Sequence, residues 1–227
     1  MIYKPDFEKA YIKATEFLIQ IADHDFPFNL RKLFAEFTDF KLISFDQLRE
    51  QGCDPKLFGS EDAFIIEAPL GYIYLCYDTN TPVERKRFSL AHELGHHCLG
   101  HNTDSSLMIS DRNLYDKQEL EANYFAAQLL MPEQIFSTLK DKGVQLNVTD
   151  IATYFKVSKE AAQKRLQTLN KRNSFKLSNE QKMWDEVISF GYRTFIKSIT
   201  SKHYHEKTWY DDEAMEQERQ RWIANGW

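Results

Sequence analysis

A pair of histidines spaced one helical turn apart is the feature that most constrains this chain. His92 and His96 lie in the segment R-F-S-L-A-H-E-L-G-H, where apolar residues recur at helical spacing. Residues four apart share one face of a helix, so both imidazoles project the same way and provide two ligands for a tetrahedral zinc ion. Glu93 is placed beside them to take a proton from an attacking water. The alternative is a surface helix whose histidines and glutamate are solvated.

The segments around this helix predict an α+β fold. Patterns of apolar residues predict these elements in chain order: helices over 6–22 and 28–37, a short strand over 40–45, strands over 63–68 and 72–77, and the motif helix over about 84–100. The short connection Pro69-Leu70-Gly71 favours an antiparallel hairpin. Gly100 is expected to end the motif helix. We therefore expect a small antiparallel sheet packed on helices.

The composition excludes several classes of protein. With 227 residues and 42% hydrophobic content, the chain can form one core with a smaller appended unit. A formal charge of −5 gives no overall nucleic-acid signature, and the sequence predicts neither a membrane span nor a signal peptide. The cysteines Cys53, Cys76 and Cys98 are odd in number and form no C-x-x-C pair, which is typical of reduced thiols in a cytoplasmic protein.

A catalytic zinc site needs a third protein ligand. The pattern H-E-x-x-H-x-x-G-x-x-H fails, because Leu99 and Asn102 occupy the places of its glycine and its last histidine. His97 and His101 are therefore expected at the rim of the site, behind the ligands or on the surface. Cys98 is turned away from the histidine face and is expected to be a small buried hydrophobe.

A carboxylate on a second helix is the better candidate. Residues 116–131 predict this helix, with Asp116 as its cap and Pro132 at its end. Glu119 and Glu121 compete for the role. Glu119 shares an inward stripe with Ala122, Asn123, Ala126 and Leu130. We expect Glu119 to face inward, toward a metal or toward a core Arg or Lys, and Glu121 to meet solvent. The small alanines would let the two helices pack closely.

The two motifs together resemble the ImmA/IrrE family of metallopeptidases. The resemblance rests on R-F-S-L-A-H-E-L-G-H-H followed by E-L-E-A-N-Y-F-A-A-Q-L-L-M-P, and it covers roughly residues 60–170. It implies a zincin-like fold and zinc held by His92, His96 and Glu119. It also implies that Asn123 orients a histidine ligand. Members of the family are intracellular proteases that cleave a cognate transcriptional repressor in phage, mobile-element or stress regulation.

The remaining parts of the mechanism stay open in the sequence. Glu93 is the expected general base, while Tyr124, His97 and His101 are all candidates to stabilise the oxyanion. The strand near Tyr72–Tyr77 is expected to form a sheet edge that pairs with an extended substrate segment. Zinc is the expected ion, although manganese or iron can occupy similar ligands.

The C-terminal part predicts further helices. Residues 149–170 are similar to a helix-turn-helix, with Ser158 capping the second helix. Ten basic and four acidic residues lie between 137 and 182, so the segment would suit DNA, but a brace for the protease is favoured. Residues 178–200 predict one more helix. We expect a zincin-like metallopeptidase domain over 1–135, a helix-turn-helix-like segment over 136–172 and a helical extension over 173–227.

Two functions from different classes follow. The first is a zinc endopeptidase whose partner is a protein substrate, a transcriptional repressor. The second is a metal-containing regulator that binds DNA or a partner protein without proteolysis. The intact Glu93 and the complete set of ligands favour the first function.

Overall fold

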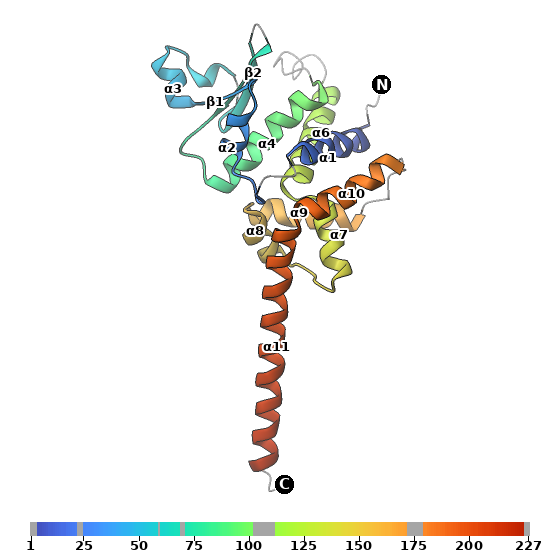
Figure 1. Cartoon of the computed structure of the whole chain (residues 1–227). Coiled ribbons are helices and arrows are strands. Elements are labelled where there is room, and N and C mark those ends of the chain that lie inside the picture. The colour runs from blue at the N-terminus through green and yellow to red at the C-terminus, as the bar shows by residue number, and fades with distance from the viewer. Residues whose placement is uncertain are drawn as a thin grey trace.

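The computed structural model describes residues 4–21, 25–58, 60–68, 71–101, 112–171 and 179–224. Figure 1 shows a small sheet above a stack of helices, with one long helix leaving the body. The elements in chain order are α1 (Phe7–Gln20), α2 (Leu30–Glu36), β1 (Phe40–Ser44), α3 (Phe45–Glu50), η1 (Pro55–Phe58), β2 (Ala63–Glu67), β3 (Ile73–Tyr77), α4 (Val83–Leu99), α6 (Arg112–Leu130), α7 (Glu133–Asp141), α8 (Val148–Phe155), α9 (Lys159–Lys171), α10 (Asn179–Gly191) and α11 (Arg193–Ala224). The predicted α+β class is confirmed.

The sheet has three strands in the order β1-β3-β2. The predicted hairpin is present, because β2 and β3 pair antiparallel with Ile65 opposite Leu75. The expectation of a purely antiparallel sheet was wrong, since β1 joins β3 in parallel, with Leu42 opposite Leu75. A parallel pair needs a long crossover, and α3 with η1 and β2 supplies it here.

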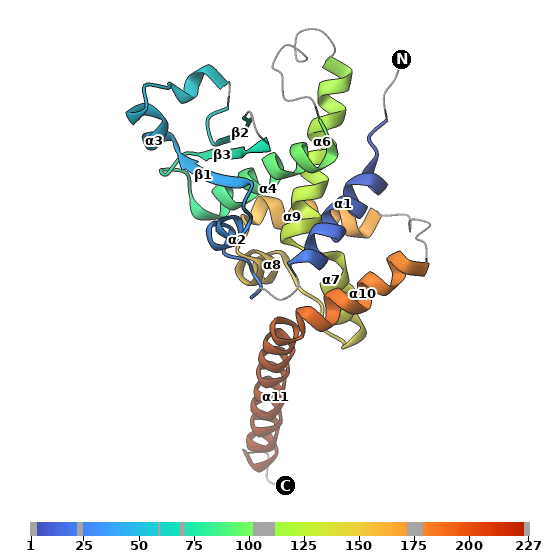
Figure 2. The same cartoon turned by 45° about the horizontal axis from the view of Figure 1, so that its top comes forward.

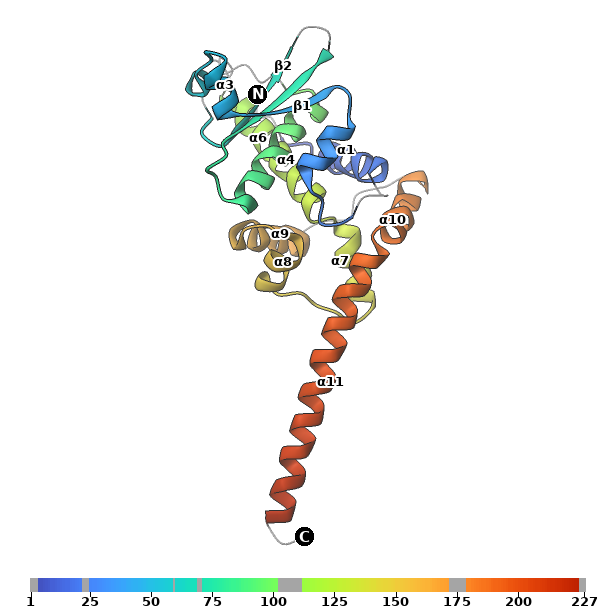
Figure 3. The same cartoon turned by 60° about the vertical axis from the view of Figure 1, so that its left-hand side comes forward.

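The helix α4 lies under the sheet and carries the histidine motif (Figures 2 and 3). Gly100 ends it with a left-handed φ of 67°, as predicted, and the His101 N–H donates to the His96 carbonyl at 3.0 Å. The helix α6 crosses beside α4 and packs against α1 on another side. Asp116 does not cap α6, because the helix begins four residues earlier at Arg112.

One hydrophobic core connects all three predicted segments. It includes Leu18, Leu94 and Phe125 under the sheet, Phe155 from α8 and Ile199 from α11. A smaller cluster lies on the other face of the sheet, where α3 covers it. The motif helix is therefore buried on several sides and held rigidly.

The predicted helix over 178–200 is divided into α10 and α11 near Tyr192. The Tyr192 side chain is buried, and its hydroxyl donates to the Leu18 carbonyl at 3.1 Å. Gly191, a weak helix former, directly precedes it. The helix α11 is 32 residues, about 48 Å, long. Its first turns pack on the core through Ile196 and Ile199, and the rest extends away from the body (Figures 1 and 3). Within the described residues, every helix is too short or too polar to cross a membrane.

Candidate metal centre

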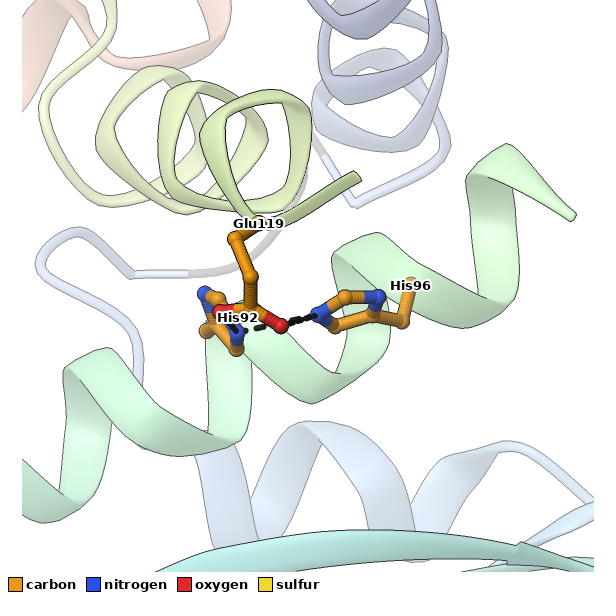
Figure 4. Close-up of side chains that lie close together, drawn as sticks. All are labelled: His92, His96 and Glu119. Atoms are coloured by element: carbon orange, nitrogen blue, oxygen red, sulfur yellow. Dashed lines mark hydrogen bonds and ion pairs between the residues drawn. The ribbon is translucent and has the colours of Figure 1, made fainter. Parts of the chain in front are cut away.

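The structure brings His92, His96 and Glu119 together, and Figure 4 shows the carboxylate reaching down from α6 to the two rings on α4. The His92 and His96 Nε2 atoms are 3.0 Å apart. Glu119 Oε2 lies 3.3 Å from the first of these nitrogens, and Oε1 lies 3.2 Å from the second. Three side chains with atoms of the kinds that bind zinc therefore converge on one small volume.

These separations fit a tetrahedral zinc ion. Zinc bonds to imidazole nitrogen and carboxylate oxygen are about 2.0–2.2 Å long, so two ligand atoms at tetrahedral corners lie about 3.3–3.6 Å apart. The three observed separations of 3.0–3.3 Å are within a few tenths of an ångström of that range. The Glu119 side chain is 31% exposed, so one side of the cluster stays open for a water and a substrate.

Both histidines have a partner behind the ring. The His92 Nδ1–H donates to Asn123 Oδ1 at 3.2 Å, as the family resemblance implied for Asn123. His96 Nδ1 lies 3.1 Å from His101 Nδ1. These contacts turn both Nε2 atoms toward Glu119.

The expectation that Glu121 meets solvent was wrong. Its side chain is only 4% exposed, and Oε2 accepts a hydrogen bond from His101 Nε2 at 2.9 Å. Oε1 accepts the backbone N–H of Asp6 and lies 3.4 Å from Lys117 Nζ. Helical periodicity misled here because α6 is covered on two sides, by α4 and by α1. The face of α6 that carries Glu121 has polar residues and was therefore expected to be exposed, but it is buried against α1.

The electrostatics of the cluster favour positive charge. Burial alone lowers the pKa of His92, but its hydrogen bond to Glu119 and the charges of Glu93 and Glu119 outweigh burial and raise the pKa. Burial also raises the pKa of Glu119, yet hydrogen bonds to both histidines hold it well below its ordinary value. Glu119 is therefore an anion at neutral pH, and a divalent cation would be drawn to the same position.

Glu93 lies beside the cluster without joining it. Burial raises the pKa of its carboxyl to about 7, and Glu119 adds repulsion while His92 partly opposes the shift. A general base works best when its pKa is close to the working pH. Such a pKa suits the role of general base that the sequence predicts for Glu93.

Close packing of α4 on α6 places Glu119 beside the two histidines. Gly95 has no side chain, and an added β-carbon would lie 3.2 Å from the Ala122 carbonyl oxygen and 3.1 Å from Phe125 Cδ1. Ala122 and Ala126 are fully buried on the facing side of α6. Small residues on both helices allow the approach that carries Glu119 to the histidines, as the alanines of the sequence suggested.

The three oxyanion candidates from the sequence are all engaged elsewhere. His97 Nδ1 donates to Glu67 Oε1 at 2.9 Å, and His101 lies behind His96. The Tyr124 ring packs 5.2 Å from the Phe7 ring, on a face of α6 away from Glu119.

A further tyrosine adjoins the cluster, and sequence reasoning missed it. Tyr115 lies one turn before Glu119 on α6 and hydrogen-bonds to its carboxylate. Burial raises the pKa of this phenol, and the charge of Glu119 adds to the shift. The helical spacing of four between Tyr115 and Glu119 was the signal that could have found it.

The sheet edge beside the site is β2. The strand at Tyr72–Tyr77 was expected to be an edge, but β3 is the central strand because β1 pairs with its other side. Asp78 N–H donates to the Asp62 carbonyl and Ala68 N–H to the Tyr72 carbonyl. Along an antiparallel ladder, residues that hydrogen-bond to the partner strand alternate with residues that do not. Asp62 and Ala68 bond to the residues that flank β3, so the backbone groups of Ala63, Ile65 and Glu67 point away from β3. Within the described residues, no strand covers that edge.

The helices α8 and α9 are tied into the core by two arginines. Arg87 of α4 donates from Nε to the Lys156 carbonyl at 3.2 Å, at the turn between the two helices, and from Nη1 to the Phe28 carbonyl. Arg165 of α9 is buried and donates from Nε to the Met131 carbonyl at 3.0 Å. These bonds support the bracing interpretation over DNA binding.

The two helices also match the sequence prediction in their limits and caps. Ser158 accepts the Ala161 N–H at 3.1 Å, as expected of a cap for α9. On the exposed face, Lys164 pairs with Glu160 at 2.7 Å. Of the basic residues counted in this part of the sequence, Arg172 and Lys176 lie outside the described residues.

Comparison with known proteins identifies this arrangement. Residues 66–167, which include α4, α6 and the α8–α9 pair, match a peptidase family model described as the IrrE N-terminal-like domain. Over these residues the chain is similar to that family. The resemblance of the two motifs to ImmA/IrrE proteins is therefore confirmed.

A relative from Bacillus phage phi105 supports the same family. The chain is 34% identical over 91 residues to its "Uncharacterized immunity region protein 2". The match covers 39% of this chain and 56% of the phage protein, so the chain spans little more than half the length of that relative.

Proposed function

We propose that this protein is a zinc-dependent endopeptidase that cleaves a specific regulatory protein, a transcriptional repressor. The observation that carries the proposal is the convergence of two imidazole Nε2 atoms and the Glu119 carboxylate, with Glu93 beside them. The match to a peptidase family supports the reaction class. The immunity-region relative supports a regulatory substrate.

The residues of the chain divide the work of hydrolysis. His92, His96 and Glu119 would hold the zinc ion, which when bound lowers the pKa of a water and polarises the scissile carbonyl. Glu93 takes the proton of the attacking water and returns it to the leaving amine. Tyr115, whose phenol lies beside Glu119, is the donor that we assign to the developing oxyanion.

The substrate segment is proposed to bind along β2. The outward backbone groups of Ala63, Ile65 and Glu67 form a row of donors and acceptors for an extended chain. The bond from His97 to Glu67 ties the end of this strand to α4. A peptide bound there would lie next to the motif helix, within reach of the cluster.

The test is cleavage by matched variants. Zinc-loaded wild type, Glu93→Gln and Glu160→Gln are incubated with each repressor that the neighbouring genes encode, and new N-termini are identified by mass spectrometry. Wild type should cut one bond, while Glu93→Gln should keep stoichiometric zinc and cut about 10²–10⁴-fold more slowly. Glu160, on the exposed face of α9, provides the control substitution, and its variant should cut as wild type does. Undiminished cleavage by Glu93→Gln, or none by zinc-loaded wild type, contradicts the proposal.

A further inference from the structure

Behind the ligand His96 lies a buried chain of three side chains. His96 Nδ1 is 3.1 Å from His101 Nδ1, and His101 Nε2 is 2.9 Å from Glu121 Oε2. The His101 and Glu121 side chains are 5% and 4% exposed, so water does not compete for these bonds. This histidine–carboxylate pair has no part in the reaction steps described above.

The protons along this chain can be assigned from chemistry alone. A carboxylate only accepts, so the nitrogen of His101 that faces Glu121 must carry its proton. In a neutral ring the other nitrogen, Nδ1, is then an acceptor, and His96 must donate to it from Nδ1–H. The proton that His96 Nε2 shares with Glu119 is then the one that a metal ion would displace, which leaves the Nε2 lone pair directed at the metal position.

We propose that His101 and Glu121 are positioning residues that fix the tautomer and the ring orientation of the ligand His96. The inference rests on the proposed metal site. A metal-binding histidine whose second nitrogen donates to a fixed acceptor is a stronger and better oriented ligand. An imidazole acceptor that is itself polarised by a carboxylate performs this role for His96, as the Asn123 amide does for His92.

The Glu121 carboxylate is held in turn by the first helix of the chain. Its Oε1 accepts the backbone N–H of Asp6, and Asp6 also caps α1 by accepting the Lys9 N–H at 2.9 Å. The N-terminal end of α1, where backbone N–H groups concentrate positive charge, therefore faces Glu121. Lys117 adds a cation 3.4 Å from the same oxygen. The Asp6 N–H and Lys117 stabilise the buried Glu121 carboxylate and hold it in place. The carboxylate in turn orients the His101 ring.

Metal affinity and the spectrum of bound Co²⁺ test the role without any assay of activity. Zinc dissociation constants are measured by competition with a chromophoric chelator for wild type, His101→Phe and His101→Gln, and folding of each metal-free protein is checked by circular dichroism. His101→Phe should bind zinc about 10–100-fold more weakly and shift the visible bands of bound Co²⁺. His101→Gln keeps one acceptor and one donor, and it should recover most of the lost affinity and the wild-type Co²⁺ bands.

A folded His101→Phe protein with the affinity and Co²⁺ spectrum of wild type overturns the proposal while leaving the proposed function intact. Wild type that binds no zinc overturns both. If the variants do not fold, histidine ¹⁵N spectra of the wild-type protein test the proposal. Histidine ¹⁵N spectra of the zinc-loaded protein should show His101 protonated at Nε2 and His96 protonated at Nδ1. A His101 ring protonated at Nδ1 overturns the proposal.

Discussion

The glycine of the histidine motif sets the distance between the two ligand-bearing helices, and replacing it should weaken the metal site. In Gly95→Ala the new β-carbon would lie 3.2 Å from both Phe125 Cβ and the Ala122 carbonyl oxygen. Ordinary contacts of this kind begin at about 3.5 Å, so α4 and α6 must separate by a few tenths of an ångström. Neither contacted atom is the end of a flexible side chain, so the helices themselves have to move.

The separation acts directly on the proposed third ligand, because His92 and His96 are on α4 and Glu119 is on α6. A zinc site tolerates deviations of about 0.2 Å in its bond lengths. We therefore expect zinc affinity to fall about 10–100-fold, as when a supporting partner of a ligand is lost. Overpacking destabilises a protein by about 1–3 kcal/mol. Alanine is about 1 kcal/mol more favourable than glycine within a helix, so the net loss of folding stability is about 0–2 kcal/mol.

The assay is chelator competition for zinc, with the free energy of unfolding of the metal-free protein measured by urea denaturation. Gly143→Ala is the matched control. Gly143 has a φ of +75° and no atom within 4 Å of an added β-carbon, so alanine strains the backbone by about 1–2 kcal/mol without touching the helix pair. The control should lose stability and keep its zinc affinity. A Gly95→Ala protein that binds zinc as tightly as wild type would refute the packing argument.

Three further predictions concern other parts of the structure. Burial raises the pKa of Glu93 from 4.5 to about 7, so the folded metal-free protein binds this proton more tightly than the unfolded chain does. The free energy of unfolding therefore falls as the pH rises from about 4.5 to about 7. Glu93→Gln should therefore raise the Tm of the metal-free protein at pH 8 but not at pH 4; equal shifts at both would contradict the burial account. Tyr115→Phe should keep its zinc and lower kcat about 10²–10³-fold on the cleaved repressor, and an unchanged kcat removes Tyr115 from the mechanism. Arg165→Met leaves the Met131 carbonyl without its donor and should destabilise by about 1.5–3 kcal/mol in urea, whereas exposed Lys164→Ala should change stability by less than about 0.5 kcal/mol.

Local geometry made much of the site predictable. The spacing of His92 and His96 follows from helical periodicity, and so does the choice of Glu119 from the stripe that it shares with Asn123. The turn chemistry at Gly100 fixed the end of α4 correctly. Each of these features depends on residues within two or three turns of one helix.

Features that depend on contacts between distant segments could not be predicted in the same way. Glu121 is buried because α1 covers its face of α6, and its hydrogen-bond donor Asp6 lies 115 residues earlier in the sequence. The central position of β3 follows from its pairing with β1, and no local pattern specifies which strands become neighbours. At the break before α11, the Tyr192 hydroxyl donates to the Leu18 carbonyl on α1, a contact that no local pattern specifies.

Anomalous X-ray diffraction at the zinc edge, on crystals of protein purified without chelators, tests the central claim most directly. The account predicts one strong peak about 2.0–2.2 Å from His92 Nε2, His96 Nε2 and a carboxylate oxygen of Glu119. The same peak should be absent from crystals of His96→Ala. A peak coordinated by Glu121 in place of Glu119, or zinc-soaked crystals with no peak at the two histidines, would contradict the account.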